Sequence, residues 1–213
     1  MSNATFRHVI EKLLQGELLC EVSDEPGYLY LQLEDNLDRV NQHLAVLGRG
    51  VALTSDMTGY YCVYLDVEDK GVRNRLNHQF YALATKWEAL LMWLRLTRQL
   101  SPEAHPLSAR DILKESELLG AIESSSALQA ELESIAQRFQ IRGKVDPRTR
   151  LNQLLRFLEK EGFLVERHPS VYQATARWSM LQDQMEFIRQ QEGIQLADRE
   201  HDQAAAQEQE QLI

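Results

Sequence analysis

Hydrophobic residues near the start of the chain recur at helical spacing in two segments, and a hairpin-like segment follows them. From Phe6 to Cys20 four aliphatic side chains share one helical face, and Gly16 offers a stop. A second run of leucines and a valine at three- and four-residue spacing ends at Gly48. Residues 51–56 and 60–67 are rich in β-branched and aromatic side chains and flank a turn that contains Gly59. The order helix, helix, hairpin predicts a winged-helix unit.

A long amphipathic run begins after Gly71 and predicts a helix that ends at Ser101, because Pro102 follows. Ser108 and Asp111 resemble a capping box, so we predict that the segment ARDILKESELL is a helix. The segment SSSALQAELESIAQRFQ predicts another helix with a serine cap. These helices lead to a second hairpin-containing unit.

The clearest pattern lies between Arg148 and Trp178, where an amphipathic helix runs into a short hairpin. Asp146 is the expected cap of this helix, and Pro147 is its expected first residue. Gly162 stands where a helix end favours a residue that tolerates positive φ. The apolar stripe comprises Leu151, Leu154, Leu155, Leu158 and Phe163. This segment predicts the recognition helix and wing of a second winged-helix unit.

The predicted fold class is therefore mainly α with small β-hairpin wings (α+β), arranged as tandem winged-helix domains. We expect an N-terminal winged-helix domain over residues 1–69 and a C-terminal winged-helix domain with a long leading helix over residues 70–192. The segment WSMLQDQMEFIRQQEG predicts one more amphipathic helix within the second domain. Residues 193–213 are acidic and poor in large apolar side chains, so we expect a mobile acidic tail there.

The chain is acidic overall, with a formal net charge of −9, but one stretch is basic. Residues 142–160 carry six basic and two acidic side chains. The expected DNA contacts are the basic side chains of this stretch and its wing, because Lys and Arg bind phosphates. These candidates are Lys144, Arg148, Arg150, Arg156, Lys160 and Arg167. We expect phosphate contacts that are sensitive to salt, because the helix shows no run of Asn, Gln and Arg at the spacing that a base-reading helix would present.

Two structural alternatives to these site assignments remain open. Lysine or arginine near a helix C-terminus also complements the helix dipole, so Lys160 needs no ligand to explain it. The tryptophans and tyrosines could stack on bases, but their helical or strand spacing is more typical of a core. Sequence spacing alone does not decide between these interpretations.

The sequence offers no catalytic or metal-binding motif. The six histidines are scattered singly, and neither a Walker lysine loop, a GxGxxG nor a GxSxG motif is present. Carboxylate pairs such as Asp35 and Asp38 are more typical of solvated helix faces than of acid–base pairs. The two cysteines, Cys20 and Cys62, lie in apolar surroundings and indicate a reducing cytoplasm. We expect no enzyme activity, no cofactor and no membrane span.

Three segments together resemble a known family. They are TGYYCVYLD, then KWEALLMWLRLTRQLSPE with the following LSARDILKE, and VDPRTRLNQLLRFLEKEGFLVERHPSVYQATARW. In their order, and over about Phe6 to Ile188, the chain is similar to the MukE/MksE group. These are tandem winged-helix, kleisin-interacting subunits of bacterial SMC-type condensins, and the short inserts resemble the MksE and Wadjet-type members more than MukE itself.

The resemblance implies an accessory subunit that is not itself an enzyme. It implies a homodimer joined through the first domain, a kleisin gripped by the second domain, an SMC-like ATPase that performs the chemistry, and double-stranded DNA held by the assembled complex at the nucleoid. By position it places the dimer interface at Leu33, Leu37, Val40 and Leu44. Chromosome organisation and plasmid defence both fit such a subunit. The alternative is a free-standing winged-helix transcription regulator, which would need to bind a specific duplex unaided.

Overall fold

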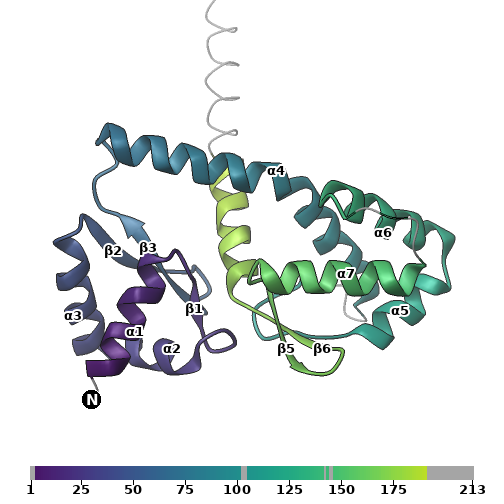
Figure 1. Ribbon diagram of the computed structural model, residues 1–213, viewed down its shortest axis with the longest axis horizontal. Helices are drawn as coiled ribbons and strands as arrows, with labels where there is room; N and C mark the ends of the chain where they lie inside the picture. The colour runs from purple at the N-terminus through teal and green to yellow at the C-terminus, as the bar shows by residue number, and fades with distance from the viewer. Residues whose placement is uncertain (1–2, 102–104, 142, 144–145, 191–213) are drawn as a thin grey trace, which may run out of the picture. The chain divides into compact units, whose positions relative to one another are not determined.

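The computed structural model describes residues 3–101, 105–141, 143 and 146–190. Two groups of helices each enclose a small antiparallel sheet (Figure 1). The first module runs from α1 to β3 and the second from α4 to β6, with three strands in each sheet. The strand order is β1-β3-β2 in one sheet and β4-β6-β5 in the other, so the first strand of each module pairs with the last. The predicted mainly helical α+β class is confirmed.

The first module consists of α1 (Asn3–Leu14), β1 (Leu19–Cys20), α2 (Glu25–Leu31), α3 (Glu34–Ala45), β2 (Arg49–Leu53) and β3 (Gly59–Tyr64). The Asp24 side chain caps α2 by accepting a hydrogen bond from the Gly27 amide at 3.0 Å. The chain leaves α1 at Gly16 and α3 at Gly48 with positive φ, which glycine adopts without a Cβ clash. Both predicted stops are confirmed, and the second apolar run of the sequence ends in α3, which α2 precedes.

The core of the first module corrects the predicted dimer interface. Val40 and Leu44 are fully buried, and they belong to the same cluster as residues of α1, α2 and β3. Leu37 is partly buried and packs against that cluster. The apolar stripe of α3 therefore covers its own module, and Val40 and Leu44 offer no surface to a second copy. Of the four predicted residues, Leu33 is the exposed one.

The second module consists of α4 (Lys70–Leu100), β4 (Ile112–Lys114), α5 (Glu115–Glu123), α6 (Ser126–Arg138), α7 (Pro147–Lys160), β5 (Leu164–His168) and β6 (Val171–Ala174). The apolar stripe of α7 is confirmed, since Leu151, Leu154, Leu155 and Leu158 are fully buried. Asp146 caps α7 by accepting from the Thr149 amide, and Gly162 follows the helix with a φ of 78°. Trp93 and Trp178 are fully buried, which agrees with the interpretation of these tryptophans as core.

The prediction of a helix over ARDILKESELL is wrong in its first half. Ile112 to Lys114 form the strand β4, and the helix α5 begins at Glu115. Only Leu113 of the strand is buried, and it pairs with Tyr172 of β6. A three-residue strand is too short to show a period of two, and its partner lies about sixty residues further along the chain. Tertiary pairing therefore overrides the local helical pattern here.

The chain continues as a helix from 177 to 190, which confirms the helix predicted before the tail. By packing, Met1–Ser179 forms one compact unit and Met180–Ile213 a second. The predicted boundary between residues 69 and 70 stays a prediction, and the predicted tail over 193–213 lies outside the described residues. Within the described residues, every helix falls short of the length and hydropathy that crossing a bilayer requires.

Candidate functional site

The exposed face of α7 carries a row of polar side chains at every fourth residue. Arg148, Arg156 and Lys160 are exposed, and Asn152 lies between the two arginines. At 1.5 Å per residue, Arg148 and Arg156 are about 12 Å apart along the helix, and Lys160 lies about 6 Å further on. That span is comparable with the width of the DNA major groove, about 12 Å. Arg148, Asn152 and Arg156 thus follow one another at four-residue spacing along α7.

Both polar groups of the Asn152 side chain are hydrogen-bonded within the protein. Its amide nitrogen donates to Glu115 Oε2 at 3.4 Å, and its carbonyl oxygen accepts from Arg156 Nε at 3.0 Å. An asparagine that reads adenine must present both groups to the base. The row is therefore suited to phosphate contact, which is the type of contact expected from the sequence.

The other predicted DNA contacts lie elsewhere. The Arg150 side chain is only 12% exposed, and its guanidinium lies 3.5 Å from Glu133 of α6. Arg167 on β5 donates from Nη2 to the Val22 carbonyl and from Nε to Gln173 Oε1, both at 2.9 Å. Lys144 lies outside the described residues. Of the predicted DNA contacts that the structure describes, the exposed ones on α7 are therefore the candidate phosphate contacts: Arg148, Arg156 and Lys160.

Carboxylates lie close to the hairpin β5–β6. Glu166 of β5 accepts a hydrogen bond from the Ser170 amide, and Glu159 at the end of α7 accepts one from the Glu166 amide. Burial raises the pKa of Tyr172 on β6, and the charges of Glu166, Glu115 and Glu159 raise it further. The arginine of this hairpin, Arg167, is bonded to Val22 and Gln173, whereas Arg148 and Arg156 of α7 are exposed.

Asp146 caps the N-terminus of α7 with a negatively charged side chain. Its carboxylate accepts from the Thr149 amide at 3.0 Å and from the Thr149 hydroxyl at 2.7 Å. These hydrogen bonds lower the pKa of Asp146, because they favour the charged form. The cap therefore keeps a negative charge near Arg148 and fixes the first turn that presents it.

An apolar patch, which we call the end patch, lies where α3 and β3 end. The Leu65 amide donates to the Gly48 carbonyl at 3.0 Å, so the residues that follow α3 lie beside those that follow β3. Val46 is 85% exposed. The end patch comprises Val46, Leu47, Leu65 and Val67, all of them exposed. The sequence does contain a signal for it, since Val46 falls off the helical face shared by Val40 and Leu44.

A groove of about 380 Å³ lies beside the edge strand β4. Its lining comes from the end of α4, the loop before β4, β4 itself and α5, with Leu100, Leu107 and Leu118 among its apolar members. The Glu115 amide donates to Ser170, and Asp111 accepts from Ala174, so these alternate residues face β6. The backbone groups of Ile112 and Lys114 therefore point to the open edge. The Ile112 side chain there is 63% exposed.

Groups of three or more His, Cys, Asp or Glu side chains that could hold a metal ion do not occur in the described part of the chain. The described residues offer three surfaces: the basic face of α7, the apolar end patch and the groove beside the open edge of β4. Such features suit binding to macromolecules.

Comparison with known proteins gives a family match and a similarity to a solved assembly. The family model described as "Condensin complex protein MksE" matches residues 4–191. No curated protein matches the chain. Among solved structures, the chain is similar to a chain of the "Nse1-Nse3-Nse4 complex", at 15% identity and a TM-score of 0.34. That similarity covers 84% of this chain and 71% of the other.

Proposed function

The chain belongs to the MksE family of condensin complex proteins, and on that premise we propose that it is a non-catalytic accessory subunit of a bacterial SMC-like condensin. In this proposal it binds the kleisin and helps the complex to hold DNA. The observation that carries the proposal is the family match over residues 4–191, because it includes both modules and the basic face of α7. ATP hydrolysis is assigned to the SMC-like partner, and the complex serves chromosome organisation or plasmid defence.

The proposed DNA contact is the row formed by Arg148, Arg156 and Lys160. These side chains are exposed, positively charged and spaced along one helix face. The exposed acids Glu34, Asp35 and Asp38 occupy the corresponding helix of the first module, α3. Since phosphate contact requires positive charge, we assign DNA to the second module.

The proposed kleisin site is the groove beside β4. Its open strand edge offers the backbone groups of Ile112 and Lys114 to an extended segment, and its apolar lining offers a place for a side chain of that segment. Adding a strand to an exposed edge is a common way to bind a peptide, because main-chain hydrogen bonds supply the affinity. The groove lies on β4 and α5, whereas the DNA row lies on α7.

The proposed homodimer uses the first module. The end patch gathers Val46, Leu47, Leu65 and Val67 on a surface that the module's own core leaves exposed. Contiguous exposed apolar side chains of this kind are typical of protein interfaces. The end patch replaces Val40 and Leu44 as the proposed interface. Leu33 is exposed just before α3, but it is not a member of the end patch.

Co-expression with a kleisin and an SMC-like ATPase encoded in the same genome tests the proposal. An affinity tag on this chain is expected to recover both partners, with the kleisin retained after the ATPase is left out. Recovery of neither partner would contradict the proposal. A gel-shift titration then addresses the transcription-regulator alternative, which requires tight and sequence-specific binding by the isolated chain.

A further inference from the structure

A set of contacts joins the sheet of the first module to the segments around β6. We call this set the joint. Several of its contacts span sequence separations of more than one hundred residues, and all of them lie within the compact unit Met1–Ser179. Its members on the first module are Cys20, Glu21, Val22, Asp56, Thr58 and Gly59, and those on the second are Arg110, Arg167, Gln173, Ala176 and Ser179.

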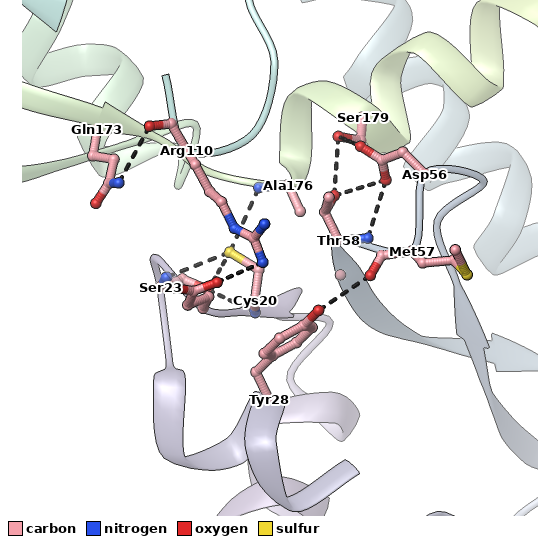
Figure 2. A network of polar contacts seen from close by, with 12 residues as sticks. Cys20, Ser23, Tyr28, Asp56, Met57, Thr58, Arg110, Gln173, Ala176 and Ser179 are labelled. Carbon is pink, nitrogen blue, oxygen red and sulfur yellow. Dashed lines mark hydrogen bonds and ion pairs between the residues drawn. The ribbon is translucent and has the colours of Figure 1, made fainter. Parts of the chain in front are cut away.

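The tip of the hairpin β2–β3 is bound to the segment after β6. Figure 2 shows the side chains of Ser179, Thr58 and Asp56 pointing toward one another. The Ser179 hydroxyl donates to Asp56 Oδ2 at 2.6 Å, and its oxygen lies 3.2 Å from the Thr58 hydroxyl oxygen. The other carboxylate oxygen of Asp56 accepts from the hydroxyls of Thr54 and Thr58 at 2.7 Å. One carboxylate thus holds the tip of the turn and the start of the helix 177–190 together.

Two arginines fasten the loop after β1. Arg110 Nη2 lies 2.5 Å from a carboxylate oxygen of Glu21, and Arg167 Nη2 donates to the Val22 carbonyl at 2.9 Å. Gln173 connects the two arginines, because its oxygen accepts from Arg167 Nε at 2.9 Å and its nitrogen donates to the Arg110 carbonyl at 3.2 Å. The Gln173–Arg110 bond and the arginine's reach toward the first module are visible in Figure 2. On the side that faces the first module, the polar side chains of the hairpin β5–β6 are therefore engaged in hydrogen bonds.

A close backbone approach completes the joint. A Cβ placed on Gly59 would lie 2.7 Å from the Ala176 Cβ and 2.7 Å from a methyl group of Leu18. Ala176 is fully buried, and its amide donates to Cys20 Sγ at 3.5 Å. Only glycine at position 59 permits this separation of the two segments, since distances below 3.0 Å force one of the partners to move.

We propose that the joint braces the two modules in one fixed geometry, and that the second wing serves as this brace and not as a DNA-contacting wing. Arg110 and Arg167 are then positioning residues, because they set where α7 stands relative to the first module. The consequence for DNA rests on the proposed function: a dimer through the first module would present two α7 faces at a fixed separation.

Distance measurement on the isolated full chain tests the brace without DNA or partners. Spin labels on unnatural amino acids at Asp38 of α3 and Gln153 of α7, both exposed, leave the native cysteines untouched. Double electron–electron resonance is expected to give one narrow distance distribution for the parent chain. The triple variant R110A/R167A/S179A is expected to broaden that distribution at least twofold, while the matched exposed control K160A leaves it unchanged.

A second pair of variants tests the close approach independently of the polar contacts. Gly59→Ala is expected to shift or broaden the distribution, and adding Ala176→Gly is expected to reverse that effect in part, because the second change removes the Ala176 methyl group, one of the two groups that the new Cβ meets. A triple variant with the parent's narrow distribution would overturn the proposal, and so would a G59A chain that folds with an unchanged distance. Because these readouts need no DNA, their failure is distinct from a failure of DNA retention by charge variants of α7.

Discussion

Neutralising the basic row of α7 should lower the salt dependence of DNA retention by the assembled complex. The variant R148A/R156A/K160A removes three exposed cations and leaves the buried stripe of α7 intact. Each phosphate contact contributes about 0.9 to the slope of log K against log salt, so three contacts contribute about 2.7 for each copy of the chain. Between about 50 and 200 mM salt a slope of that size corresponds to an affinity change of about 40-fold.

The assay is the affinity of the reconstituted complex for a duplex, measured by fluorescence anisotropy over that salt range. Arg150→Ala is the matched control, because Arg150 lies on the same helix but is mostly buried beside Glu133. The control should leave the slope unchanged, and kleisin binding should be unaffected by the triple variant. An unchanged slope in the triple variant, or an equal fall in the control, would refute the assignment of DNA to this face.

Three further predictions concern the other surfaces and the joint. Leu65→Asp in the end patch should weaken homodimerisation by about 30-fold, since a central interface residue contributes about 2 kcal/mol, and light scattering should then detect the monomer mass. Ile112→Asp should weaken kleisin binding at least about tenfold in titration calorimetry, because it replaces the exposed apolar side chain at the edge of the groove with a charge, while the DNA salt slope stays as in the parent chain. Burial alone would raise the pKa of Asp56, but hydrogen bonds from Ser179, Thr58 and Thr54 outweigh it and hold that pKa below its ordinary value of 3.8. The stability contributed by a lowered carboxylate pKa is present above that ordinary value and is lost as pH falls through the folded-state pKa. Below about pH 4 the free energy of unfolding of the parent chain should therefore fall more steeply with pH than that of Asp56→Asn. Parallel curves of unfolding free energy against pH would show that these hydrogen bonds contribute nothing.

Local signals in the sequence predicted the helices well, because their causes are local. Asp146, Pro147 and Gly162 define the two ends of α7 through backbone chemistry that operates within one turn, and the leucine stripe fixes its buried face. Ser125 caps α6 for the same reason. By contrast, β1 and β4 are strands of two and three residues, and each exists because a distant strand pairs with it.

The site residues were harder to predict, because their roles depend on neighbours from other elements. Arg148 and Arg150 are two residues apart on one helix, yet α6 approaches only the face that carries Arg150. Arg167 bonds to a carbonyl 145 residues away, which no spacing in the sequence indicates. The stripe of Val40 and Leu44 correctly predicted an apolar face, but periodicity does not reveal whether such a face meets its own module or a second copy.

The central claim, that this chain is a kleisin-binding condensin subunit, is tested most directly by mixing the purified chain with a purified kleisin encoded in the same genome. Size-exclusion chromatography with light scattering should show one peak that contains both proteins at a fixed stoichiometry. Two separate peaks over the whole micromolar range, together with tight binding of the chain alone to one specific duplex, would contradict the account and favour a free-standing DNA-binding regulator.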